Sequence, residues 1–393
     1  MDFNFTEEQL MITDTARSFL QEVSSSEKIR EAMTTSTGYT VKTWERICQE
    51  MYWQGIHIPE EYGGLGLSFV ELACVFEESG RHLLCSPFFA TAGLATNALI
   101  VGGSTEQKEK YLPLFAAGEC TGTVAYTGNN GHWDEHGVQA TYTRKGDEFV
   151  LNGELRYVPD GHHADLLVVA AREQGSYGKQ GISLFLVDTQ TSGIKKTPLL
   201  TMDQTRPQAA IVLNHVEVKA ENILGESGNG WSLLSVIIQL ATIATAAEQL
   251  GGMEQTMDMA VSYTKGRSQF NRPVASFQSI KHKAADMMTR TEVARSAVYY
   301  SACIAAEAIA ARKFDNSLAE AASIAKAWCS DGYFSNSSDC LQLHGGVGFS
   351  WEYDVHLYLK RAKSSETFLG NSAWHRDRVA DMILGSNLKE EIH

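Results

Sequence analysis

The sequence predicts an α+β protein of several domains: an N-terminal helical domain, a middle β-barrel or sandwich, and a C-terminal four-helix bundle. Three observations predict this order. Apolar residues recur at helical intervals through residues 1–120, short alternating runs fill residues 121–225, and long helical patterns return over residues 226–393. A chain of 393 residues is long enough to bury the cores of two or three domains.

The composition excludes several classes of function. The net charge is −14 with scattered acids, which argues against nucleic-acid binding and against docking on an anionic membrane. The most apolar run, Leu233–Ala247, is shorter than the roughly 20 residues that span a bilayer, and the N-terminus lacks an apolar signal core. Seven dispersed cysteines without a CxxC pair indicate reduced thiols and no zinc site. We expect a cytoplasmic protein without membrane insertion.

The N-terminal domain should begin with a capped helix. Thr6 precedes Glu7 and Glu8, and an N-cap hydroxyl followed by acids suits the first turn of a helix. Further helices are expected to end near Gly55 and to begin near Ser68, Phe89 and Ser104. The glycine-rich segment IPEEYGGLGLS is interpreted as structural, because no strand precedes it and no GK[ST] follows.

The middle domain is predicted from five runs of alternating apolar and polar residues, with turn-rich segments between them. The runs are GVQATYTR, EFVLNGEL, DLLVVAAR, ISLFLVD and QAAIVLNHVEV. About seven strands closing into a barrel or sandwich is the natural result.

The C-terminal domain should be an antiparallel bundle with short connections. The helical patterns cover Trp231–Lys265, Ser276–Arg312 and Ser317–Leu343, with a last helix after Gly370. The first is apolar nearly all round, which predicts a helix buried inside the bundle.

The segment RSQFNRPVASFQSIKH, residues 267–282, joins the first two of these helices. Its guanidinium (Arg267) suits a pyrophosphate, its aromatic ring (Phe270) suits a flat ring system, and its carboxamide (Gln278) suits an adenine edge. These groups favour a nucleotide cofactor. The alternative is a connecting loop with a solvated arginine and a core phenylalanine.

Several motifs resemble those of the acyl-CoA dehydrogenase family over essentially the whole chain. They are R-x-x-F…F-Q-x-x-K-H from Arg267, Q-L-H-G-G-V-G-F at 342–349, L-N-G-E-L-x-Y-V-x-x-G at 151–161 and P-E-E-Y-G-G-L-G-L after residue 58. The resemblance implies FAD as cofactor, an acyl-CoA substrate, an electron-transfer acceptor and α,β-dehydrogenation of the thioester. It also implies residues that reach across a subunit interface to a neighbour's FAD: Arg267, Phe270, Gln278, Gln342, Gly345 and Gly346.

The family's catalytic base is missing from both of its usual positions. In most members a glutamate precedes the final helix, and counting from Ala362–Lys363 places it on Leu369. Other members carry it on the first bundle helix, and counting back from Arg267 places it on Ala241. Neither side chain accepts a proton. Glu366 is the displaced alternative, although its spacing points elsewhere.

The segments that hold the flavin ring in the family are altered as well. T-E-P-x-A-G-S-D becomes T-G-N-N-G-H-W-D at 127–134, which keeps Thr127 and Asp134. W-I-T becomes Tyr157-Val158-Pro159, which loses the threonine hydroxyl usually given to flavin N5. Proline also lacks a backbone N–H.

We therefore hypothesise a subunit of a heteromeric (α2β2) acyl-CoA dehydrogenase that has no base and completes the FAD site of a homologous subunit. The tail, His356–Lys363 and Leu369–Arg376, resembles degraded subunits of assemblies that dehydrogenate steroid CoA-thioester side chains. Two alternatives stay open: a self-sufficient homotetrameric dehydrogenase that uses a displaced acid, and a non-redox acyl-CoA-binding or scaffold protein.

Overall fold

The computed structural model describes residues 5–385 and divides the chain into two compact units. Unit 1 comprises Met1–Arg30, Phe69–Leu84 and Thr242–His393, and unit 2 comprises Glu31–Ser68 and Cys85–Ala241. The N-terminal helices are thereby shared between the two units.

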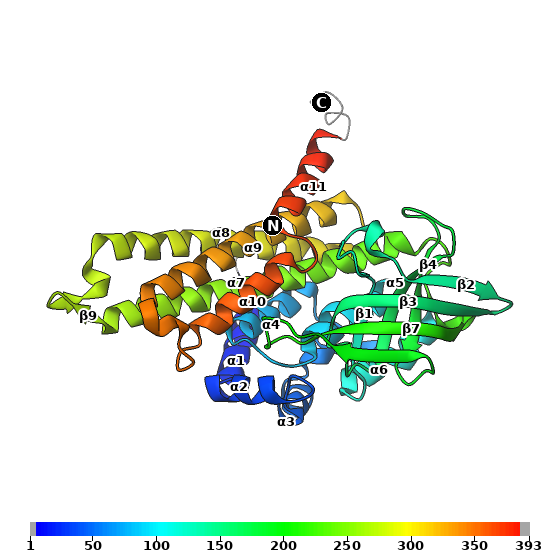
Figure 1. Cartoon of the computed structure of the whole chain (residues 1–393), viewed down its shortest axis with the longest axis horizontal. Helices are drawn as coiled ribbons and strands as arrows, with labels where there is room; N and C mark the ends of the chain where they lie inside the picture. The colour runs from blue at the N-terminus through cyan, green and yellow to red at the C-terminus, as the bar shows by residue number, and fades with distance from the viewer. Residues whose placement is uncertain (1–4, 386–393) are drawn as a thin grey trace. The chain divides into compact units, whose positions relative to one another are not determined.

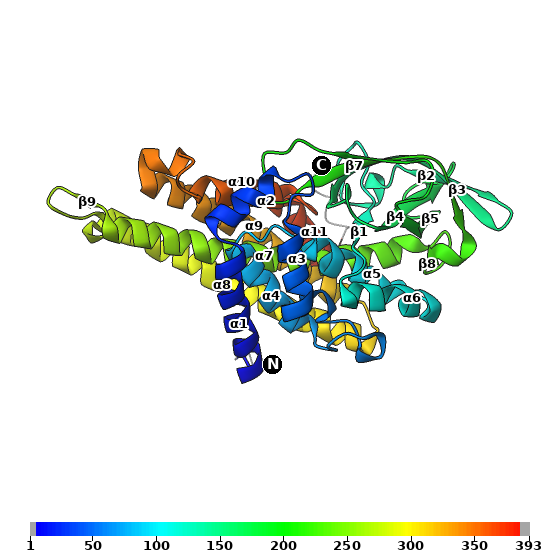
Figure 2. The ribbon, with the colours of Figure 1, turned by 90° about the horizontal axis from the view of Figure 1, so that it is seen from below.

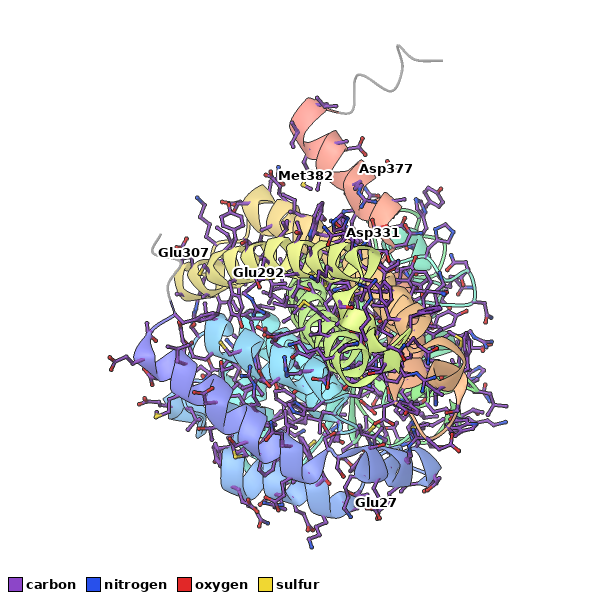
Figure 3. The ribbon with its side chains drawn as sticks, turned by 90° about the vertical axis from the view of Figure 1, so that its left-hand side faces the viewer. Glu27, Glu292, Glu307, Asp331, Asp377 and Met382 are labelled. Carbon is purple, nitrogen blue, oxygen red and sulfur yellow. The ribbon has the colours of Figure 1, made fainter. Side chains whose placement is uncertain are left out.

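Unit 1 is helical (Figure 1). Its helices are α1 (Glu7–Val23), α4 (Phe69–Arg81), α8 (Gln278–Ala311), α9 (Asn316–His344), α10 (Val355–Thr367), α11 (Ser372–Leu384) and the part of α7 (Gly230–Gly266) from Thr242 onward. Figure 3 shows α11, labelled at Asp377 and Met382, leading away from the other helices. An ion pair between Arg376 and Asp331 of α9 holds the start of α11.

The predicted start of the first helix is confirmed. The Thr6 hydroxyl accepts a hydrogen bond from Gln9 N at 3.2 Å, and the Gln9 side chain accepts one from Thr6 N at 3.1 Å. Ser104 and Gln107 form the same reciprocal cap on α6 (Thr105–Ala117) in unit 2. Such caps stabilise a helix by about 1 kcal/mol because they satisfy backbone N–H groups that have no partner inside the helix.

Helix α10 is a further helix of unit 1 that the sequence pattern did not single out. It buries Val355, Tyr358 and Ala362 on one side. Its charged residues, concentrated at Lys360, Arg361 and Lys363, interrupt the apolar pattern and obscure the helical period. α10 connects the glycine-rich loop to the turn at residue 369 and therefore sets the positions of both along the chain.

Helices α4 and α7 approach closely within unit 1 through two glycines. A Cβ at Gly251 would lie 1.7 Å from Glu77 O, and a Cβ at Gly80 would lie 1.9 Å from Glu248 O. Both distances are far below van der Waals contact, so only glycine permits this approach.

Gly251→Ala is therefore expected to lower the free energy of unfolding by about 3 kcal/mol, at the upper end of overpacking effects, because the obstructing atoms are backbone. Thermal unfolding measures the change. Gly266→Ala is the matched control, since a Cβ there meets nothing within 4 Å. Equal melting temperatures for the two variants would contradict the close approach.

Unit 2 is built on a mixed sheet (Figure 2). Its strands in the described chain are β1 (Gly122–Ala125), β2 (Thr141–Lys145), β3 (Glu148–Pro159), β4 (Leu166–Glu173), β5 (Ile182–Asp188), β6 (Ile194–Pro198), β7 (Gln208–Lys219) and β8 (Ile223–Leu224). Their order is β6-β7-β3-β2-β4-β5-β8, and β1 pairs with β4 in parallel. Each of the five alternating runs supplies at least part of a strand.

Unit 2 has an aromatic cluster in the interior of its sheet and several short helices. Tyr142, Phe149 and Phe185 form an aromatic cluster with ring centroids 5.3–5.6 Å apart. Unit 2 also contains α3 (Val41–Arg46), the π-helical segment Phe89–Thr96 and α5 (Asn97–Gly102), while α2 (Ser26–Thr34) lies at the boundary of the two units.

Helix α7, 37 residues long, is the one described helix whose length and composition would allow it to cross a membrane. In its most apolar 18-residue window, 72% of the residues are buried inside the structure. That burial is typical of a helix in a protein core, as the apolar pattern of the sequence predicted.

Candidate functional site

The segment after α7 folds as a hairpin in which β9 (Ser268–Gln269) pairs with β10 (Arg272–Pro273). Phe270 and Asn271 form its turn, with φ of 53° and 61°, as a type I′ turn requires. Val274 N donates to Arg267 O at 2.8 Å and closes the base of the hairpin. Figures 1 and 2 both show the hairpin extending beyond the helices of unit 1.

The hairpin presents its side chains to the outside. The side chain of Phe270 is 86% exposed, so the alternative of a core phenylalanine is wrong. Arg267 and Gln278, the first residue of α8, are exposed too. Arg272 is also exposed, and its guanidinium carbon lies over the ring of Phe277, 3.9 Å from the centroid. The guanidinium of Arg267, unlike that of Arg272, therefore does not lie over an aromatic ring of the hairpin segment.

The sequence around the hairpin has an excess of basic residues, although the whole chain is acidic and Asp339 of α9 pairs with Lys283 at 2.5 Å. No aspartate or glutamate occurs between Asp258 and Asp286 in the sequence. The same stretch contains the basic residues Lys265, Arg267, Arg272, Lys281 and Lys283. A local excess of positive charge attracts phosphates.

The glycine-rich loop lies at the same end of unit 1. His344 stacks on Tyr263 with ring centroids 4.2 Å apart, and Tyr263 O accepts a hydrogen bond from Arg267 N at 2.9 Å. The ring of His344 is buried and its Nδ1 donates to Cys340 O at 2.8 Å, while burial lowers its pKa. His344 is thus a structural residue that joins the loop to the hairpin.

Gln342, Gly345 and Gly346 are exposed at this end. Gly345 has φ 64° and ψ −145°, a conformation that favours glycine. A Cβ at Gly345 or Gly346 would meet nothing within 4 Å, so the backbone is open to close approach. Together with the guanidinium, ring and carboxamides above, these glycines provide donors, an aromatic face and open backbone, which are the kinds of group that bind a dinucleotide.

The turn that should carry the family's base is built differently. The side chain of Leu369 is 1% exposed, and its backbone is left-handed at φ 61°. His375 Nε2 donates to Leu369 O at 3.0 Å. Burial lowers the pKa of His375, so its imidazole is neutral. A buried hydrocarbon therefore occupies this position.

A buried lysine, which the sequence analysis missed, holds the same turn from the other side. Lys326 of α9 is fully buried and its Nζ lies within hydrogen-bonding distance of four oxygens. These are Ser330 Oγ and Ser365 O at 2.9 Å, and Glu366 O and Gly370 O at 3.1 Å. Burial lowers the pKa of Lys326 to about 7. In the sequence, the indication of this buried lysine is a single basic residue within SIAKAWCS, a run of mostly small and apolar residues.

The other candidate positions for the base lie as follows. The Glu366 carboxylate accepts a hydrogen bond from Lys363 Nζ at 2.8 Å on the same helix, and its side chain is partly exposed. Ala241 is fully buried in α7 and offers only a methyl group. The Glu366 carboxylate is thus committed to an ion pair on its own helix.

In unit 2 the segments that would face a flavin ring pack on themselves. The ring of Trp133 lies 5.9 Å from that of Tyr126 and 6.3 Å from that of Tyr157. The Thr127 hydroxyl donates to His132 O at 3.0 Å, so it is engaged within its own loop. Asp134 accepts a hydrogen bond from His136 N, also locally.

Tyr157 has φ 57° and precedes Pro159, whose carbonyl accepts a hydrogen bond from Thr123 Oγ1 at 2.8 Å. Pro159 has neither a hydroxyl nor an N–H to offer. The residues of these two segments therefore do not fit a flavin ring, in contrast to the exposed donors of the hairpin and the glycine-rich loop.

Comparisons with known proteins agree with this architecture. Residues 6–119, 123–216 and 228–384 match the N-terminal, middle and C-terminal domains of acyl-CoA dehydrogenase, respectively. A Bacillus subtilis acyl-CoA dehydrogenase is 31% identical over 339 residues, which cover 84% of this chain and 86% of the relative.

Two solved structures are similar throughout. Butyryl-CoA dehydrogenase from Megasphaera elsdenii has a TM-score of 0.89 and 29% identity, covering 98% of this chain and 100% of the other. A Tcur3481-Tcur3483 steroid ACAD variant has a TM-score of 0.84 and 27% identity, covering 97% and 99%. The chain belongs to the acyl-CoA dehydrogenase family of FAD-dependent oxidoreductases.

Proposed function

We propose that this chain is the base-lacking subunit of a heteromeric acyl-CoA dehydrogenase and completes the FAD site of a homologous, acid-bearing subunit in an α2β2 assembly. The observation that carries the proposal is a contrast between two sets of residues. Leu369 is a buried hydrocarbon at the base position, whereas Arg267, Phe270 and Gln342 are exposed beside open glycine backbone.

In this assembly the FAD supplies the hydride-accepting ring, and the partner supplies the base. This chain contributes binding: Arg267 would pair with the pyrophosphate, Phe270 would pack on the adenosine side, and Gln278 and Gln342 would offer amide hydrogen bonds. Gly345 and Gly346 allow the cofactor to approach the backbone. A charge-assisted bond to phosphate is among the stronger hydrogen bonds in proteins.

The substrate class we propose is an acyl-CoA thioester with a steroid side chain. The structural neighbour Tcur3481-Tcur3483 steroid ACAD, whose name pairs two polypeptides and a steroid class, supports both the class and the heteromer. We further propose a cytoplasmic location and an electron-transfer protein as the acceptor. Among the remaining alternatives, a homotetramer that uses Glu366 is disfavoured by the ion pair of Glu366 with Lys363.

The assay that tests the proposal measures dehydrogenation of a panel of acyl-CoA thioesters, including steroid side chains, with an artificial electron acceptor. This chain alone should show no turnover, and co-expression with an acid-bearing homologue encoded nearby should produce it. Glu366→Gln in this chain should leave the turnover of the heteromer unchanged. Turnover by the solitary chain that Glu366→Gln abolishes would contradict the proposal.

Leu369→Glu in the solitary chain is expected to leave turnover at the background. A carboxylate would then stand at the base position, but Trp133 and Pro159 would still occupy the flavin-ring segments. General-base catalysis typically contributes roughly 10²- to 10⁴-fold. A gain of that size from this single change, in the same assay, would show that the ring segments do not limit the chain.

A further inference from the structure

Three aromatic rings lie together behind the glycine-rich loop of unit 1. The ring of His344 stacks on that of Tyr263 with an angle of 23° between their planes. The ring of Tyr353 meets both edge-on, 5.9 Å from His344 and 6.2 Å from Tyr263. The three rings join the C-terminal ends of two long helices, α7 and α9, to the segment that follows the loop.

His344 holds the glycine-rich loop on one side of this stack. Its Nδ1 donates to Cys340 O at 2.8 Å, one helical turn back, which fixes the plane of the ring. The loop then folds over the residue, because a Cβ at Gly348 would lie only 3.1 Å from His344 Cβ. A side chain that is 6% exposed, hydrogen-bonded and stacked has little freedom to move. Its position therefore determines where the backbone of Gly345 and Gly346 lies.

Tyr263 holds the hairpin on the other side of the stack. It lies in the last turn of α7, and its carbonyl accepts a hydrogen bond from Arg267 N at 2.9 Å, where the helix ends and the hairpin begins. Among residues 5–385 no hydrogen bond, ion pair or ring contact joins His344 to Arg267 directly. The stack of His344 on Tyr263 therefore connects the loop to the start of the hairpin.

We infer that His344 is a positioning residue for the FAD of the homologous subunit, and that its stack on Tyr263 sets the separation between the Arg267 guanidinium and the open glycine backbone. The inference rests on the proposed function and deepens it, since it names the side chain that fixes the site before the cofactor arrives. A pyrophosphate that meets a guanidinium and open backbone at the same time needs them at a fixed separation. Groups ordered in advance lose less entropy on binding, which raises affinity.

Titration of the flavin-free heteromer with FAD separates the ring of His344 from its hydrogen bond. His344→Ala should weaken FAD binding about 10-fold, because the loop and the hairpin lose their common support. His344→Phe keeps a ring for Tyr263 and should bind FAD within about 3-fold of the wild type. His344→Asn keeps a donor for Cys340 O but no ring, and should behave like His344→Ala. Full affinity in His344→Asn together with a loss in His344→Phe would contradict the role of the stack.

Coupling to Arg267 separates positioning from a general loss of stability. If His344 positions the guanidinium, Arg267→Ala should cost at least about 5-fold less affinity in the His344→Ala background than in the wild type. Arg272→Ala in the same background is the control and should show no such coupling, since its guanidinium lies over the ring of Phe277. Tyr263→Ala removes the other ring but keeps the carbonyl for Arg267 N, so it gives the same test if His344→Ala does not fold.

The outcomes distinguish this inference from the proposed function. If Arg267→Ala weakens FAD binding equally in both backgrounds, the positioning role is wrong and the proposed function stands. If His344→Ala binds FAD like the wild type, the inference falls in the same way. If Arg267→Ala leaves the FAD affinity of the otherwise wild-type heteromer unchanged, both proposals fall, because this chain then lies outside the FAD site.

Discussion

Arg267→Ala in the heteromer is expected to weaken FAD binding by roughly 10- to 150-fold, because a hydrogen bond to a charged group contributes about 1.5–3 kcal/mol. The structure gives two reasons to choose this residue. Its side chain is exposed at the base of the hairpin, and Tyr263, whose carbonyl receives its backbone N–H, stacks on His344 beside the open glycines. Titration of the flavin-free complex with FAD, followed by fluorescence quenching, measures the change.

Arg272→Ala is the matched control because it removes an arginine from the same hairpin. Its guanidinium lies over the ring of Phe277, so FAD affinity should change by less than about 3-fold. Equal losses for the two variants would indicate that general positive charge, not a placed guanidinium, attracts the cofactor. An unchanged affinity for Arg267→Ala would remove this chain from the FAD site.

Lys326→Met is expected to lower the free energy of unfolding by about 2–4 kcal/mol, because buried acceptors lose their donor. The methionine would leave the carbonyls of Ser365, Glu366 and Gly370 without the ammonium that now serves them. Part of this loss is offset, because the variant no longer buries the charged ammonium group of Lys326. Chemical denaturation at pH 7 measures the difference.

The effect should also depend on pH, and the sign follows from the pKa. Burial lowers the pKa of Lys326 from 10.5 to about 7, so between these values the unfolded chain binds more protons than the folded one. The free energy of unfolding of the wild type relative to Lys326→Met should therefore rise from pH 7 to pH 10. It should be constant below pH 6. A difference that does not vary with pH would mean that Lys326 keeps its charge in the fold.

Lys363→Met is the control for this substitution. Lys363 lies on α10, whereas Lys326 lies on α9, and Lys363 is half exposed and paired with Glu366, an arrangement worth at most about 0.5 kcal/mol. If Lys363→Met were as damaging as Lys326→Met, the buried bonds to the turn would not be the source of stability.

Local rules predicted much of the fold. Thr6 and Ser104 begin helices because their hydroxyls cap them, and the all-round apolar pattern from Trp231 correctly predicts a buried helix. The rules failed for α10, whose charged residues obscure its period. They also could not predict the close approach at Gly80 and Gly251, because that contact depends on two segments far apart in the sequence.

The candidate site was only partly predictable for the same reason. Spacing located Leu369 and the residues of the hairpin, but only the exposure of Phe270 excluded a core phenylalanine there. Lys326 carries no motif, and its role appears only when α9 meets the turn after α10. The mutual packing of Trp133 and Tyr157 likewise joins two segments of unit 2 that the sequence keeps apart.

The flavin content of the purified chain, read from its absorption between 350 and 500 nm, tests the proposed partner dependence of FAD binding. We expect a colourless chain when it is made alone, and about one FAD per pair of subunits after co-purification with the acid-bearing homologue. One FAD per solitary chain would contradict it, because the chain would then hold a complete cofactor site without a partner.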